Sequence, residues 1–143
     1  MTSREWRNHF LHNQHDRFRI PWEAPIIPPV AGRAAILSSL ACFQLGESSD
    51  GRRLRRLAWG TGDALYAEAI ELFIAEEQEH ARLLGDILDR FATPRLHRHW
   101  AHWLFRHCRH TLGFRSEIVV LLMAEIAGMK YYGAMRAGID DVA

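Results

Sequence analysis

The sequence contains a Glu-x-x-His motif, Glu77-Gln78-Glu79-His80, within a stretch of strong helical character. On an α-helix a spacing of three residues is a rotation of roughly 300°, so Glu77 and His80 leave the same face about one turn apart. A carboxylate and a neutral imidazole at that spacing can bind one divalent metal ion together. The pair also falls on an apolar stripe, where a carboxylate is costly unless its charge is compensated. The stripe is Phe73, Glu77, His80, Leu84, Ile87 and Phe91.

Two more glutamates fall on the apolar stripes of other expected helices. Glu47 continues a stripe that runs from Ile36 to Leu57, and Glu125 has apolar neighbours one turn away on both sides. Any one of these acids is most simply a residue at the stripe edge, or a buried acid paired with an arginine. Together, carboxylates on facing helices with one histidine three residues on are the plan of a carboxylate-bridged dinuclear metal site.

The elements that must position these residues are almost all helical. The first thirty residues predict a short helix over Arg4–Asn13 and then a proline-rich extended arm, Ile20–Val30, that packs on the body. The stripe through Glu47 stays in phase across the weak helix formers 46–51, which predicts one long helix over Gly32–Trp59.

Two further long helices are expected. Asp63 follows a Thr-Gly turn and predicts the N-cap of a helix that ends near Phe91. A segment rich in Trp, His and Arg, His97–Leu112, then leads to a last long helix over Arg115–Ala137. Its expected inner face comprises Ile118, Leu121, Leu122, Glu125, Met129 and Tyr132.

Length and composition are those of one globular domain, with 1–30 as the N-terminal helix and arm and 31–143 as a helical bundle. A net charge of +1 argues against an electrostatic nucleic-acid binder, and 48% apolar residues argue against a disordered chain. Two isolated cysteines, Cys42 and Cys108, and the lack of a signal-peptide pattern predict a cytoplasmic protein. The longest uninterrupted apolar run, Ile118–Ala124, is too short to span a bilayer, so no membrane partner is expected.

The segments Phe43–Gly51 and Phe73–Ala81, together with Glu125 and Tyr131-Tyr132, resemble bacterial ferritin-like domain proteins of the di-iron carboxylate class. The resemblance covers most of the chain and implies an all-α, ferritin-like, up-down helical bundle with a crossover segment. It implies metal ligands at Glu47, Glu77, His80 and Glu125, with Glu77 bridging two iron ions, or manganese in their place. It also implies dioxygen as a partner, and oxidase, oxygenase or ferroxidase-like activity in a complete family member.

The chain departs from the family pattern in one respect. Family members continue into a fourth helix with a second Glu-x-x-His, so the expectation here is a bundle truncated by one helix. The alternative function is a non-catalytic helical interaction or structural protein with an incomplete metal site. Such a protein would self-associate through its open groove as a homodimer. A further alternative is a metal-free bundle whose buried acids are protonated or paired with arginine.

Other groups of residues are weaker candidates for a functional site. The histidines of the segment after residue 96 alternate with arginines and are typical of a solvated helix face. The arginine run in 52–56 is interrupted by the inward-facing Leu54 and predicts the outer face of an amphipathic helix rather than a nucleic-acid site. Tyr131 and Tyr132 are interpreted as aromatic core residues. The histidines of the segment after residue 96 are His97, His99, His102, His107 and His110.

Overall fold

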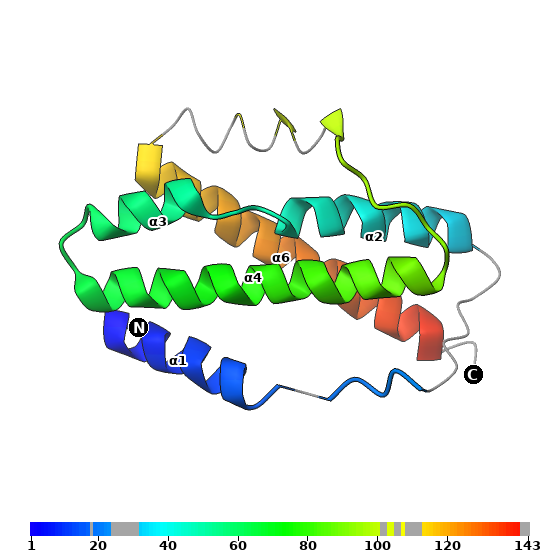
Figure 1. Cartoon of the computed structure of the whole chain (residues 1–143), viewed down its shortest axis with the longest axis horizontal. Helices are drawn as coiled ribbons and strands as arrows, with labels where there is room; N and C mark the ends of the chain where they lie inside the picture. Colours follow the sequence, from blue (N-terminus) through cyan, green and yellow to red (C-terminus); the bar gives the residue numbers. More distant parts are fainter. Residues whose placement is uncertain (18, 24–31, 101–102, 105–106, 108–112, 141–143) are drawn as a thin grey trace.

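The computed structural model describes residues 1–17, 19–23, 32–100, 103–104, 107 and 113–140, and within the last helix the side chains of 115–137. Throughout this part of the chain the regular structure is helical, which confirms the all-α fold class (Figure 1). The long helix α4 runs the length of the molecule, with α1 on one side and α2 and α3 on another, and α6 crosses behind it (Figure 1). The helices are α1 (Ser3–His15), α2 (Arg33–Glu47), α3 (Arg52–Trp59), α4 (Ala64–Arg90) and α6 (Gly113–Asp140).

Helix α1 begins with a capping box, in which the Thr2 hydroxyl accepts from the Glu5 amide and the Glu5 carboxylate accepts from the Thr2 amide. The helix packs on α4 through the rings of Phe10 and Phe73, whose centroids are 5.8 Å apart. Most of the expected arm, residues 24–31, lies outside the described residues. Within its described start, the Trp22 ring lies 5.3 Å from the Arg90 guanidinium, so this end of the arm contacts the last turn of α4.

The expected continuous helix over Gly32–Trp59 is wrong. Helix α2 ends at Glu47 and α3 begins at Arg52, after Gly51 adopts a left-handed conformation with φ of +63°. The Ser48 hydroxyl donates to the carbonyl of Leu45 and competes with continuation of the helix. Weak helix propensity therefore prevails here over the in-phase stripe. Both helices still pack along α4, which explains why the apolar pattern continues across the break (Figure 1).

We expect Gly51→Ala to destabilise the protein by about 1–3 kcal/mol, because alanine is strained at this φ and its Cβ would meet Ile74. A Cβ at Gly51 would lie 2.7 Å from two carbons of Ile74. Gly46→Ala is the matched control, since Gly46 lies in α2 and a Cβ there meets nothing within 4 Å. Chemical denaturation should show Gly46→Ala as neutral or more stable than wild type. Equal destabilisation by both changes would contradict the account.

Helix α4 begins where the sequence predicts, because the Asp63 carboxylate accepts a hydrogen bond of 3.0 Å from the Tyr66 amide. The most buried residues of α4 follow one side of the helix, and this side is shifted by about one residue from the apolar stripe that the sequence predicts. Glu77 lies on this side, whereas His80 lies at its edge with 46% of its side chain exposed. The fully buried apolar residues of α4 are Ala67, Ala69, Ile70, Ile74, Ala81, Leu84 and Leu88.

Two apolar clusters hold the bundle together. One lies between α3 and the first half of α4, and Ile118 and Leu121 of α6 pack against it. The other lies between α2 and the second half of α4, and Tyr131 and Met135 of α6 pack against it. Helix α6 therefore contacts both clusters through a few side chains, and Glu125 lies between these contacts along the helix.

The expected inner face of α6 is partly wrong. Leu122, Met129 and Tyr132 were predicted to point inward, yet their exposed fractions are 57%, 66% and 37%. The helix is apolar on both sides, so sequence periodicity alone does not fix its rotation. The residues that turn inward lie near the line through Glu117, Leu121, Gly128 and Tyr131.

Part of α6 is long and apolar enough to cross a membrane by length and composition. The segment Arg115–Ala137 has a mean hydropathy of 1.4 over its most apolar window. The uninterrupted apolar run Ile118–Ala124 is short because Glu125 divides the apolar segment.

The Trp- and His-rich segment before α6 is described only in part. His102 and His110 lie outside the described residues, and residues 97–99 are described and not helical. In the described part, the Trp103 and His107 rings stack with centroids 5.4 Å apart.

Candidate metal centre

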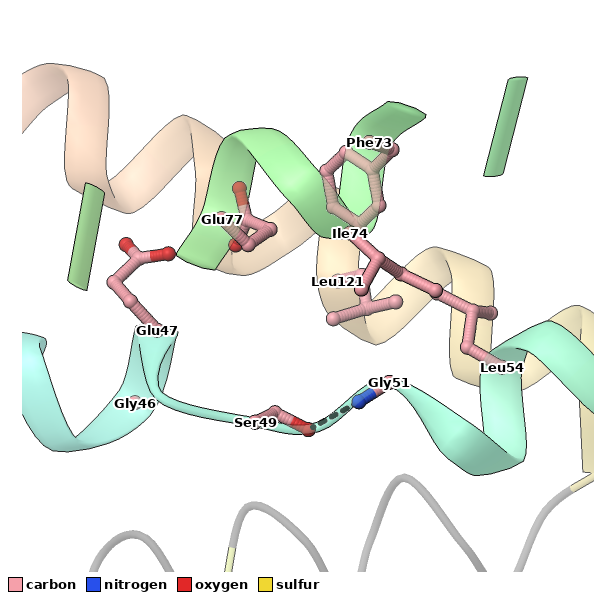
Figure 2. A pocket seen from close by; sticks show the side chains of 9 residues that line it. All are labelled: Gly46, Glu47, Ser49, Gly51, Leu54, Phe73, Ile74, Glu77 and Leu121. Atoms are coloured by element: carbon pink, nitrogen blue, oxygen red, sulfur yellow. Dashed lines mark hydrogen bonds between the residues drawn. The ribbon is translucent and has the colours of Figure 1, made fainter. Parts of the chain in front are cut away.

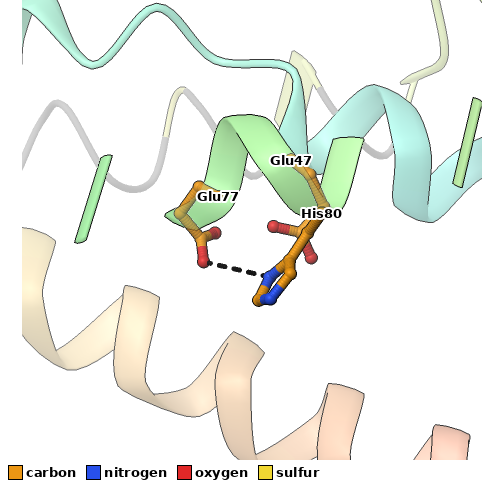
Figure 3. Close-up of side chains that lie close together, drawn as sticks. All are labelled: Glu47, Glu77 and His80. Carbon is orange, nitrogen blue, oxygen red and sulfur yellow. Dashed lines mark ion pairs between the residues drawn. The ribbon is translucent and has the colours of Figure 1, made fainter. Parts of the chain in front are cut away.

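Three of the four predicted ligands gather between α2 and α4 (Figure 3). Glu47 is the last residue of α2, and Glu77 and His80 lie one turn apart on α4. One donor atom from each of the three lies within 4.8 Å of the others. His80 Nδ1 is 3.7 Å from Glu77 Oε1. The break after α2 therefore leaves Glu47 at a helix end, but its side chain still turns toward α4 (Figure 3).

The donor set suits a divalent transition ion. Two carboxylates and one imidazole are ligands for iron, manganese or zinc. Two donors bound at 2.0–2.2 Å to one ion can be at most about 4.4 Å apart. The observed spread of up to 4.8 Å thus needs only small side-chain rotations. One oxygen of Glu47, Oε2, is buried and has no hydrogen-bond partner among the described residues. A buried carboxylate oxygen without a partner is costly, and a cation would compensate it.

Glu47 is the most perturbed acid of the cluster. Burial, a hydrogen bond with Glu77 and the charges of Glu77 and Glu125 raise the pKa of Glu47 to about 9. Without a cation, Glu47 is therefore protonated at neutral pH. A metal ion would have to displace that proton, so binding by this cluster releases protons.

Glu77 and His80 form the charged part of the cluster. Burial would raise the pKa of Glu77, but the ion pair with His80 and the contact with Glu47 outweigh it, and the pKa is lowered. The ion pair with Glu77 raises the pKa of His80 against the opposing effect of burial. Glu77 thus remains a carboxylate that is available to bridge or to bind a cation.

Glu125, the fourth predicted ligand, lies outside the set of mutually close donors. It is half-buried on α6, and burial followed by the charge of Glu77 raises its pKa. Its charge in turn contributes to the raised pKa values of Glu47 and His80. Glu125 therefore belongs to the electrostatic surroundings of the cluster, whereas the three donors from α2 and α4 form its centre.

A cavity of about 90 Å³ adjoins the two carboxylates (Figure 2). Glu47 and Glu77 lie together on one side of it, and apolar side chains from α3, α4 and α6 form the other walls (Figure 2). The backbone between α2 and α3 forms its floor, where the Gly51 amide donates to Ser49 Oγ. The volume suits a molecule of a few heavy atoms. The apolar lining residues are Leu54, Phe73, Ile74 and Leu121.

Tyr131 packs on the core as predicted for an aromatic core residue, whereas Tyr132 is 37% exposed and contacts the Phe43 ring at its inner side. The Phe43 and Tyr131 rings stack at 4.6 Å, and the Tyr131 hydroxyl shares a hydrogen bond with Ser39. Burial, followed by the charge of Glu47, raises the pKa of Tyr132. Tyr132 is therefore neutral at physiological pH and adds no negative charge.

Sequence reasoning missed one buried acid, Glu117 of α6. Its side chain is fully buried, and Oε2 accepts a hydrogen bond of 3.0 Å from Arg53 Nε on α3. The arginine run was predicted to be an outer face, which is true of Arg52 and Arg56 but not of Arg53. The signal available in the sequence was the position of Glu117 on the same side of α6 as Leu121 and Glu125.

We expect the metal-free protein to lose stability as pH rises from about 4.5 to about 9. The folded-state pKa of Glu47 is raised from 4.5, so the folded state holds a proton that the unfolded state releases. The raised pKa of His80 acts in the same direction above its ordinary value of 6.5. The lowered pKa of Glu77 acts only in acid, below its ordinary value of 4.5.

Melting curves of chelator-treated protein between about pH 5 and pH 9 would measure this dependence. Glu47→Gln, which is neutral at every pH, should flatten the profile. An unchanged pH dependence in Glu47→Gln would show that the Glu47 proton does not control stability.

Comparisons with known proteins find no match for this chain among protein-family models, curated proteins or solved structures.

Proposed function

We propose that the chain binds iron or manganese through Glu47, Glu77 and His80 and supports oxygen-dependent redox chemistry of the di-iron carboxylate type. The observation that carries the proposal is the convergence of two carboxylates and one imidazole within 4.8 Å, with a buried oxygen of Glu47 lacking a hydrogen-bond partner among the described residues. The ferritin-like resemblance supports the same assignment, and it adds Glu125 as a ligand of a second ion.

Each residue has a distinct part in this proposal. Glu77 supplies a charged carboxylate close to the other two donors, and His80 contributes its ring once it loses a proton. Glu47 exchanges its proton for the ion. When bound, ferrous ions supply electrons and open coordination positions for dioxygen. The apolar walls of the adjoining cavity keep water away from the side of the carboxylates where a small substrate would fit.

Oxidation of ferrous iron tests the proposal. Protein loaded with Fe(II) without oxygen should form Fe(III) on exposure to air faster than Fe(II) in buffer does, as followed by absorbance. Glu77→Gln keeps the side-chain volume but removes the charge, and should lower the rate to that of buffer. Glu68→Gln is the matched control, because Glu68 lies on the same helix but pairs with Arg7 of α1. Wild-type protein that does not accelerate oxidation would overturn the redox proposal.

The alternative of a non-catalytic bundle has one specific observation in its favour. The raised pKa of Glu47 lets the cluster exist without metal as a protonated acid beside a charged one. The two functions differ in their response to metal: a structural bundle gains no stability from Fe(II) or Mn(II).

A further inference from the structure

One side of α6 exposes a continuous row of large apolar side chains. They recur at steps of three and four, the spacing that keeps residues on one face of a helix. Their exposed fractions range from 41% to 66%. A row of this size on a protein surface marks an interaction site. We call it the outer face of α6; it consists of Val119, Leu122, Met123, Ile126 and Met129.

Within residues 115–137 of α6, the exposed charged side chains have one sign. Arg115 lies at one end of the row and Lys130 and Arg136 at the other, and all three are exposed. Within residues 115–137, both acids turn to the opposite side of the helix. Glu117 is buried against Arg53, and Glu125 is half-buried near the metal centre. The outer face therefore presents apolar side chains, over roughly 15 Å of helix, between basic ends.

We propose that the outer face of α6 docks the protein on the surface of an anionic lipid bilayer. A helix with an apolar face and basic flanking residues lies in the interface plane, with the apolar side chains inserted below the headgroups. Anionic headgroups attract nearby lysine and arginine side chains, and the cytoplasmic leaflet carries such lipids. The mean hydropathy of 1.4 over the most apolar window of Arg115–Ala137 reflects the same apolar character.

The helix lies on the bilayer and does not cross it. Glu117 is held by Arg53 of α3, and Ile118, Leu121, Tyr131 and Met135 pack against the two apolar clusters of the bundle. Crossing the membrane would require breaking all of these contacts along one side of α6. Docking by the outer face leaves them intact.

Charge also distinguishes the bilayer from a second copy of the chain. A symmetric contact between two outer faces would bring two rows with exposed basic residues together, in either helix direction. Like charges in such a contact are unfavourable. An anionic surface complements them.

Vesicle flotation tests the proposal with the full chain. The protein should bind vesicles of phosphatidylcholine with phosphatidylglycerol, bind pure phosphatidylcholine vesicles less, and lose binding as salt concentration rises. Met129→Glu should weaken partitioning at least tenfold, because it places an acid in the apolar row. Arg56→Gln, which makes the same change in net charge on the exposed side of α3, is the control and should bind as wild type does.

Lys130→Gln provides a second variant, which should reduce the preference for phosphatidylglycerol, and circular dichroism checks that each variant is folded. No binding to the anionic vesicles at low salt would overturn the proposal. It would also be overturned if sedimentation without vesicles showed a dimer that Met129→Glu converts to monomer, since a second copy would then cover the face. Neither readout depends on metal, so these outcomes are separate from those for the metal centre.

Discussion

Replacing His80 by alanine should remove most of the thermal stabilisation that Mn(II) or Fe(II) gives to the protein. A ligand that binds only the folded state stabilises it by about 2.7 kcal/mol at one hundred times its dissociation constant. Without His80 two carboxylates remain, and one of them, Glu47, holds a proton at neutral pH. If affinity falls about 100-fold, the same metal concentration gives the variant only about 0.4 kcal/mol.

The control for this prediction is His12→Ala. His12 lies on α1 and its side chain is 73% exposed, away from the metal centre. Melting temperatures with and without metal should therefore rise equally in wild type and His12→Ala, and much less in His80→Ala. The same rise in all three proteins would show that the metal acts elsewhere on the surface.

Replacing Arg53 by methionine should cost about 3 kcal/mol of unfolding free energy. Removing one partner of a buried ion pair typically costs about 3–5 kcal/mol. The lower end applies here because Glu117 is fully buried whereas 40% of the Arg53 side chain is exposed. Chemical denaturation at neutral pH would measure the loss.

Two further variants test the cause of this loss. Arg56→Met, on the exposed side of the same helix, should change stability by less than about 0.5 kcal/mol. The double variant Arg53→Met/Glu117→Leu should recover part of the loss, because it removes the buried charge together with its partner. If Arg53→Met and Arg56→Met were equally stable, the pair would contribute nothing measurable.

The sequence predicts the helices and much of the cluster because both follow from local patterns. Asp63 has the side chain and spacing of an N-cap, and the expected start of α4 is confirmed. Glu77 and His80 are on one helix three residues apart, so their closeness requires only that α4 form. Glu47 reaches them because α2 packs along α4 in the phase of its apolar stripe.

The predictions of helix bounds and buried faces fail where they depend on more than the local sequence pattern. The phase of the stripe through Glu47 suggested one helix, but α2 ends at Glu47, and Gly51, in a left-handed conformation against Ile74, precedes a separate helix α3. Helix α6 is apolar on two sides, so its rotation depends on the packing of Ile118 and Leu121 and not on its own periodicity. Leu122 and Met129 were misplaced for this reason, and the pairing of Arg53 with Glu117 across two helices has no local signal.

Metal content after equilibrium dialysis against Fe(II) without oxygen tests the central claim most directly. The wild-type chain should retain at least one ion per chain at a metal concentration where the triple variant Glu47→Gln/Glu77→Gln/His80→Ala retains none, with circular dichroism showing that both are folded. The triple change removes all three donors that lie close together while leaving Glu125, Glu117 and the exposed acids in place. Equal iron content in the two proteins would contradict the assignment of the metal centre.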